Sequence, residues 1–234
     1  MNELVHSLQA KKKTAAKKAV SPVVKVLATS RTNDPARTMA GILEVATKEF
    51  AEKGLSGARI DAIAAATQTS KRMIYYYFGN KEGLYVAVLE ESYRRMRAIE
   101  SEQHLADLAP EAALRKLVEF TFDHHQGNPE YIRLVMNENM AHGVCLAQSE
   151  TIRELNMPAI ESIQNLYDRG VVQGVFRPGL DPIDIHASIS ALTFFNVSNQ
   201  HTIGLIFKHD GQSPEALAAR RHSVVELIVR FVCC

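Results

Sequence analysis

The 234-residue chain lacks tryptophan and contains only three cysteines, eight prolines and twelve glycines. Sparse glycine and proline favour a helical protein. Three cysteines, without a close pair of histidines beside them, argue against a disulfide framework and against a structural zinc site. No apolar run approaches the length of a membrane span, and none follows the first basic residues as in a signal peptide. We therefore expect a cytoplasmic protein of one large or two modest domains, without a membrane partner.

The charged residues are unevenly distributed along the chain. Residues 1–33 contain seven Lys or Arg and one acid, residues 34–95 contain nine and eight, and residues 96–234 contain eleven and seventeen. The overall charge near +1 hides this gradient. It predicts that a polyanion such as DNA binds near the N-terminal end.

Residues 36–89 have the pattern of three short helices followed by a longer one. Asp34 and Pro35 are a typical helix start, and Gly54 is a typical helix end. A second helix is expected from Ile60 to about Ala66. After a three-residue turn, Ser70 is expected to cap a third helix, which ends at Gly79 before Asn80 caps the next helix. Two short helices joined by a tight turn predict a helix-turn-helix, whose second helix enters the DNA major groove.

The third predicted helix, Lys-Arg-Met-Ile-Tyr-Tyr-Tyr-Phe, combines basic and aromatic residues. Ile74 and Phe78 are four residues apart and predict the inward face. Lysine and arginine neutralise phosphates, and arginine can bind guanine edges with two hydrogen bonds. Alternatively, the segment is an ordinary core helix with a basic end. Three consecutive tyrosines cannot all face one core, however, so DNA binding is the better interpretation.

This block resembles the TetR family of bacterial transcriptional regulators. The family pattern is matched by Phe50, Gly54, Ile63-Ala64, Ser70, Ile74 through Phe78, and Lys81-Glu82-Gly83-Leu84. The resemblance implies an all-α protein: a two-fold dimer with an N-terminal helix-turn-helix and a helical C-terminal domain for ligand binding and dimerisation. It implies repression at a palindromic operator on double-stranded DNA. We expect no enzymatic activity, no cofactor and no metal, and an enzyme is the weaker rival interpretation.

Carried over by position, the resemblance implies that the start of the third helix faces DNA bases. It implies that the tyrosines of this helix and the start of the next helix contact phosphates or sugars. Two departures stand out. The turn Thr67-Gln68-Thr69 lacks the glycine usual in the family, so Gln68 is expected in a left-handed conformation. Arg59 replaces part of the usual start of the second helix, and we expect it to contact DNA. The predicted DNA contacts are Arg59, Ser70, Lys71, Arg72, Met73, Tyr75, Tyr76, Tyr77 and Lys81.

The C-terminal part is expected to contain helices over 80–104, 110–126, 129–141, 149–170, 181–206 and 214–232, with a loop over 173–180. The last two are rich in apolar residues, including Ile183, Phe195 and Leu227. In the family such a pair forms a four-helix interface with its twin, which predicts a homodimer. The alternative is an ordinary core within one chain.

A pocket for a small-molecule effector is expected among these helices. An apolar cavity with a few amides and a histidine suits a partly polar organic molecule. The predicted ligand contacts are Tyr131, Met136, Asn137, Asn139, His142, Tyr167, Phe194, Phe195 and Asn196.

Other chemistry is less well supported. The pair His124-His125 lacks further ligands at a spacing that would close a metal site. His142 and Cys145 are three residues apart and could form an activated thiol, although such a cysteine is more often structural. No nucleophile elbow or glycine-rich phosphate loop is present.

The sequence therefore predicts three regions: a basic arm over 1–33, a helix-turn-helix over 34–80, and a ligand-binding and dimerisation domain over 81–234. The arm either follows the DNA or is a solubilising tail. The expected function is a repressor that a small effector releases from its operator. The rival is a constitutive or partner-controlled architectural DNA-binding protein, which a filled C-terminal core would favour.

Overall fold

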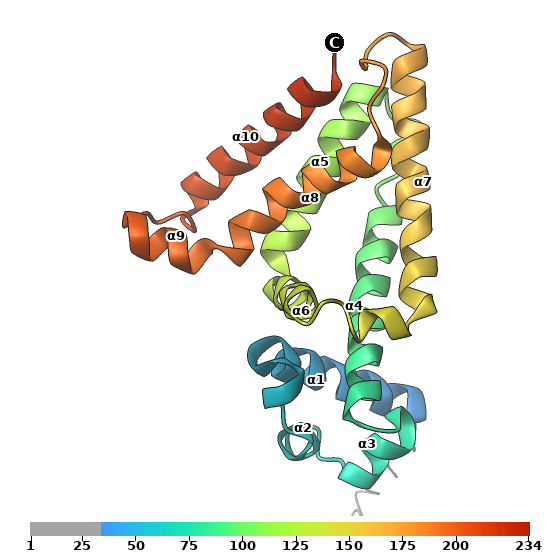
Figure 1. Ribbon diagram of the computed structural model, residues 1–234, viewed down its shortest axis with the longest axis vertical. Helices are drawn as coiled ribbons and strands as arrows, with labels where there is room; N and C mark the ends of the chain where they lie inside the picture. Colours follow the sequence, from blue (N-terminus) through green and yellow to red (C-terminus); the bar gives the residue numbers. More distant parts are fainter. Residues whose placement is uncertain (1–33) are drawn as a thin grey trace, which may run out of the picture. The chain divides into compact units, whose positions relative to one another are not determined.

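The computed structural model describes residues 34–234, which form an all-helical structure as predicted (Figure 1). The predicted arm over residues 1–33 lies outside the described residues. In the described part, extended pairing is limited to an isolated bridge between Phe176 and Cys233. The α-helices are α1 (Pro35–Gly57), α2 (Ile60–Ala66), α3 (Lys71–Phe78), α4 (Lys81–Ser101), α5 (Pro110–Gly127), α6 (Pro129–Met140), α7 (Glu150–Val172), α8 (Pro182–Ser198), α9 (Gln200–Phe207) and α10 (Pro214–Val232), with short 3-10 turns at Leu105–Asp107 and Leu146–Gln148.

The predicted capping residues begin the first helices. The carboxylate of Asp34 accepts a hydrogen bond from the Arg37 N–H at 3.2 Å, and the Asn80 side chain accepts one from the Gly83 N–H at 2.7 Å. Gly54 interrupts the regular helix as predicted, with a non-helical backbone of φ 65° and ψ 177°. A short further helical segment continues beyond this kink, so α1 extends to Gly57.

One hydrophobic core joins α1, α2 and α3 to the helices that follow them. Phe50 of α1 is fully buried and packs edge-on against Tyr85 of α4, with ring centroids 5.0 Å apart. The same core reaches Leu134 of α6 and Ile152 of α7. The predicted division after residue 80 therefore coincides with the start of α4 and not with a gap in the core. The first part of α4 is anchored among the N-terminal helices.

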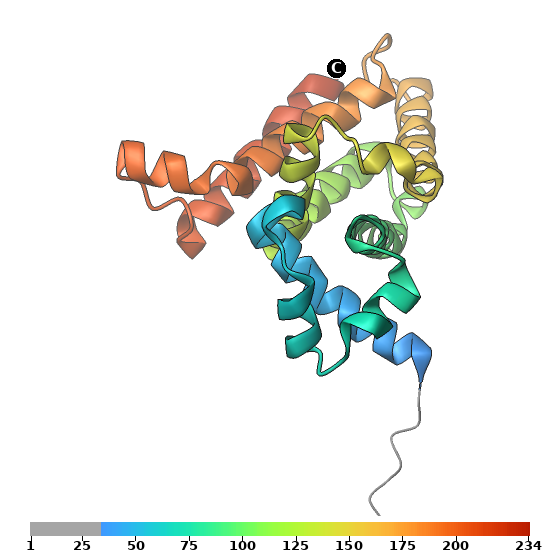
Figure 2. The same ribbon diagram turned by 60° about the horizontal axis from the view of Figure 1, so that its bottom comes forward.

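A second core lies between α5, α7, α8 and α10. Ile185 and Ile189 of α8 and Val224 and Ile228 of α10 are buried in it. Figure 1 shows α8 crossing α5, and Figures 1 and 2 show α9 at the far end of α8 and α10. The predicted loop over 173–180 connects α7 to α8, and Gly170 lets it pack closely, because a Cβ there would lie 2.0 Å from the Phe176 ring.

Two predicted helix boundaries were wrong. The expected helix over 181–206 breaks at Asn199, whose N–H donates to the Phe195 carbonyl at 3.1 Å and whose carbonyl accepts from the Ile203 N–H at 3.0 Å. Asn199 thus closes α8 and opens α9. The helix expected to reach His104 ends at Ser101, because His104 adopts a left-handed conformation with φ of 50°. The other boundaries predicted for the helices after α3 agree to within two residues.

Candidate nucleic-acid interface and internal cavity

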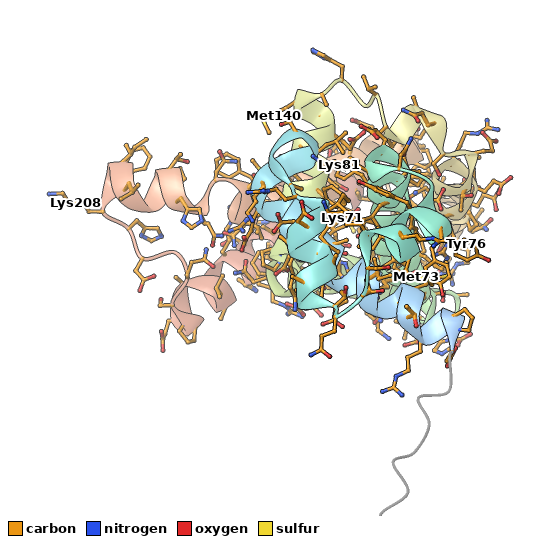
Figure 3. The ribbon with its side chains drawn as sticks, turned by 90° about the horizontal axis from the view of Figure 1, so that it is seen from below. Lys71, Met73, Tyr76, Lys81, Met140 and Lys208 are labelled. Carbon is orange, nitrogen blue, oxygen red and sulfur yellow. The ribbon has the colours of Figure 1, made fainter. Side chains whose placement is uncertain are left out.

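Helix α3 has one buried side and one exposed side. Ser70 begins it by accepting a hydrogen bond from the Met73 N–H at 3.2 Å. Ile74 is fully buried, whereas 77% of Tyr76 and 43% of Tyr75 are exposed. Figure 3 looks onto this end of the described molecule, where Lys71, Met73 and Tyr76 come from α3. The exposed side can therefore contact a partner without disturbing the core.

The nine predicted DNA contacts fall into two groups by exposure. Most are exposed, and Met73, Tyr77 and Lys81 are half-buried. Gln68 has φ of 51°, so the left-handed turn conformation expected from the missing glycine is confirmed. The Thr69 N–H donates to the Ala64 carbonyl at 3.0 Å and closes the turn between α2 and α3. The exposed contacts are Arg59, Ser70, Lys71, Arg72, Tyr75 and Tyr76.

Two of the cations already have partners within the protein. Lys71 forms an ion pair with Asp61 of α2, and the Lys81 ammonium donates to the Ser56 carbonyl at 3.1 Å. Sequence reasoning missed both partners, because they lie on other elements at no regular spacing. In the described residues the side chains of Arg59 and Arg72 form no ion pair, so they retain their donors for phosphates or bases.

The longer helices surround a partly open pocket of about 520 Å³, which we call the cavity. Its wall combines apolar side chains from several helices, among them Met96, Leu117, Ile163 and Ile189, with polar groups. A volume in this range suits a small organic ligand. The polar wall residues are Tyr93, Arg97, Glu100, Thr121, His125, Tyr131, Ser149, Glu150, Arg153, Asn156, His186 and Ser190.

Of the nine predicted ligand contacts, only Tyr131 lines this cavity. Phe195 and Asn196 line a smaller pocket of about 250 Å³ beside α9. The remaining six line neither pocket, so the residues predicted from the sequence are mostly not those of the cavity wall. They are Met136, Asn137, Asn139, His142, Tyr167 and Phe194.

Several of these six have structural partners instead. The Asn137 amide donates to the Phe50 carbonyl of α1 at 3.3 Å, and the Asn139 amide donates to the Val135 carbonyl at 2.9 Å. The Tyr167 hydroxyl donates to the Arg177 carbonyl at 2.9 Å and accepts from the Leu180 N–H at 2.9 Å, which fastens the α7–α8 loop. Phe194 packs edge-on against His125.

The sequence placed the pocket among helices that include α4 but did not identify which residues of α4 line it. Tyr93, Arg97 and Glu100 line it from one side of this helix. Their spacings of four and three residues place them on one helical face, which was the available signal. The sequence shows that these three residues share a helical face. It does not show that the other helices leave a space opposite that face.

The histidines beside the cavity are held neutral. His125 is 5% exposed, and its Nδ1 lies 2.9 Å from the Thr193 hydroxyl. Burial lowers the pKa of His125 to about 4, with smaller contributions from His124, Arg97 and His186. Burial also lowers the pKa of His124 and of His186. Among the described residues no three His, Cys, Asp or Glu side chains are grouped as metal ligands.

The cysteine beside His142 does not have the environment of an activated thiol. Cys145 is 5% exposed, and burial raises the pKa of its thiol. An activated thiol needs the opposite shift. Cys145 instead packs in the core shared by α1 and α4.

The C-terminal helices expose part of their apolar surface. Leu227 of α10 is 50% exposed, and Ile183 and Phe195 of α8 are 60% and 49% exposed. Residues Leu205, Ile206 and Phe207 of α9 are still more exposed. These helices therefore supply both the intrachain core and an uncovered apolar face. None of the helices in residues 34–234 has the combined length and apolar character needed to cross a membrane.

Comparison with known proteins finds matches to two family models along the chain. Residues 42–88 match the family described as bacterial regulatory proteins, tetR family, and residues 110–228 match the tetracyclin repressor-like C-terminal domain. The transcriptional repressor NicS of Pseudomonas putida is 32% identical over 83% of this chain and 92% of its own length. The transcriptional repressor SCO4008 of Streptomyces coelicolor is 35% identical over 59% of this chain and 69% of its own length. A solved tetR-family regulatory protein from Rhodococcus RHA1 shares the fold, with a TM-score of 0.66 and 23% identity over 85% of this chain and 98% of that one. The chain belongs to the TetR family of bacterial transcriptional regulators.

Proposed function

We propose that this protein is a homodimeric repressor whose two α3 helices bind a palindromic operator and are released by a small molecule in the cavity. The observation that carries the proposal is the double role of α4. Its first half packs in the core of the DNA-binding helices through Leu84, Tyr85 and Val88, and its second half lines the cavity through Tyr93 and Arg97. A ligand that moves α4 would therefore move α3 as well.

A second connection supports this coupling. The buried carboxylate of Glu138 on α6 accepts a hydrogen bond from the Leu146 N–H at 2.8 Å, and together with burial it raises the pKa of the Tyr85 hydroxyl on α4. The Ser149 hydroxyl, beside the cavity, donates to Glu90 of α4 at 2.6 Å. Helices α4 and α6 and the segment before α7 are thus tied together at the junction between cavity and DNA-binding helices.

The uncovered apolar faces of α8 and α10 support dimerisation. Ile183, Phe195 and Leu227 are large side chains whose burial against a second copy would be favourable. Two protomers would present two copies of α3, so a two-fold operator with half-sites about one DNA turn apart would match them. The relatives NicS and SCO4008 are named as repressors, which supports repression over activation.

The rival proposal is a DNA-binding protein that is not controlled by a small ligand. A filled C-terminal core would have favoured it, whereas the helices here leave a partly open pocket of about 520 Å³. The cavity therefore favours ligand control.

The test begins with purified full-length protein and fragments of its source genome, selected for binding and then footprinted at fixed salt. We expect one short palindromic site, protected by a dimer. The protein–operator complex is then exposed to a panel of small metabolites, and a variant with a filled cavity, Ser190→Phe, serves as the matched control. Release of the wild type but not of the variant would support the proposal. Salt-sensitive binding without a preferred site would overturn it in favour of the architectural alternative.

A further inference from the structure

The cavity wall contains a buried cation whose hydrogen-bonding capacity is mostly unused. The Arg97 side chain is 12% exposed, and one of its terminal nitrogens donates to Glu100, one turn later on α4. Its Nε is buried without a hydrogen-bond partner in the described residues. A guanidinium has five N–H donors, and leaving buried donors unpaired is costly. Arg97 is therefore poised to accept a further anionic or polar partner.

The surroundings of Arg97 do not compensate its charge fully. Burial is the largest influence on Glu100 and raises the pKa of this carboxyl, against the opposing effect of Arg97. The nearby His125 and His186 stay neutral, partly because the charge of Arg97 lowers their pKa. The other arginine of the wall, Arg153, is 74% exposed and pairs with Glu150. Arg97 is thus the buried cation of this cavity.

We propose that the cavity takes a small organic acid, whose carboxylate binds the Arg97 guanidinium while its apolar body packs against Met96, Leu117, Ile163 and Ile189. This inference rests on the proposed function, in which the cavity is the effector site, and adds the chemical class of the ligand. Arginine pairs with carboxylates through charge-assisted hydrogen bonds, which are stronger inside a protein than in water. The apolar residues named favour a ring or an alkyl chain over a small polar acid such as acetate.

In this arrangement Glu100 competes with the ligand. Both carboxylates need the same guanidinium, so an arriving acid must share Arg97 with Glu100 or displace it. Replacing Glu100 by neutral glutamine removes the competitor and leaves an uncompensated cation. The proposal therefore predicts that Glu100→Gln binds acids more tightly than the wild type does.

The experiment is isothermal titration of the full-length protein with paired probes. The acids are benzoate, 2-naphthoate, indole-3-acetate and octanoate, and each is compared with its uncharged amide. We expect at least one acid to bind, and to bind at least about tenfold more tightly than its amide, since a hydrogen-bonded charge contributes at least that much. Arg97→Gln should remove this preference, and Glu100→Gln should increase it.

The single variants can lose stability, because each leaves one buried charge unpaired. The double variant Arg97→Gln/Glu100→Gln keeps the site neutral and is the decisive control for folding. It should bind acid and amide with similar affinity. Arg95→Gln makes the same change of charge on α4, on a side chain that is 54% exposed and does not line this cavity, and should retain the acid preference.

The proposal is overturned if none of the acids binds, if the amides bind as tightly as the acids, or if the double variant keeps the preference. Operator binding, measured in parallel without any probe, distinguishes this failure from failure of the proposed function. An intact operator complex that responds to neutral molecules would leave the proposed function standing and refute only the organic acid.

Discussion

Two arginines of this molecule lie in opposite environments. Arg72 is exposed at the start of α3, where water surrounds its charge, whereas Arg97 is almost entirely buried in the cavity wall. An exposed cation suits a large polyanion that approaches from outside, and its contribution depends on salt. A buried cation is weakly screened and suits a single small anion. The two regions thus use the same residue type for partners of very different size.

The two regions also differ in how their residues are assembled. The exposed side of α3 comes from consecutive residues of one helix, over Lys71–Phe78. The cavity wall comes from α4, α5, α6, α7 and α8, over residues 93–190. A substitution on the exposed side of α3 should therefore change DNA binding alone, whereas one beside the cavity should affect packing as well.

The largest effect is expected on the buried side of α3. Ile74→Ala should lower the free energy of unfolding by about 2–5 kcal/mol, because it creates a cavity in a fully packed core. Tyr76→Ala should change it by less than about 0.5 kcal/mol, because 77% of Tyr76 is exposed, and should weaken DNA binding instead. Urea denaturation and operator titration measure the two effects. A large loss of stability for Tyr76→Ala would refute the division of α3 into two sides.

Arg72→Ala should weaken specific operator binding by about 1–3 kcal/mol if Arg72 contacts a base. Its exposure predicts little change in stability. Titration of operator and random DNA at one salt concentration measures both affinities. Lys48→Ala, on an exposed cation of α1 that pairs with Glu44, is the matched control. An equal loss of affinity on both DNAs would make Arg72 a phosphate contact.

A smaller effect is expected from pH at the cavity wall. The pKa of His125 is lowered from its ordinary 6.5 to about 4 by burial, so between these values the unfolded chain binds more protons than the folded one. The stability associated with neutral His125 is therefore complete above pH 6.5 and is lost as the pH falls through this window. At pH 5.5 the loss is on the order of 1 kcal/mol.

The variant His125→Asn keeps a side chain that can hydrogen-bond with Thr193 and cannot titrate in this range. Unfolding of both proteins is followed from pH 7 to pH 5.5. We expect the stability difference between them to shift in favour of the variant as the pH falls. His124, His186 and Glu100 are present in both proteins, so the part of their titration that is independent of His125 cancels in the difference. Parallel pH curves would show that His125 does not contribute.

Where the physics is local, residue patterns predicted the structure well. Asp34, Ser70 and Asn80 cap their helices as expected, and Gln68 adopts the left-handed conformation that the missing glycine demands. Each of these features depends on a few neighbouring residues. The break at Asn199 was missed, because its flanking segments are both apolar and helical and contain no proline or glycine at the break.

The sequence by itself determined the helical architecture, the helix-turn-helix and the exposed, basic side of α3, because helical periodicity and capping act over a few residues. Only the tertiary structure decided which side chains enclose the cavity, that Asp61 pairs with Lys71, and that Asn137 of α6 binds the Phe50 carbonyl of α1. These contacts join residues far apart in the chain. Their geometry follows from how whole helices pack, and no local pattern encodes that packing.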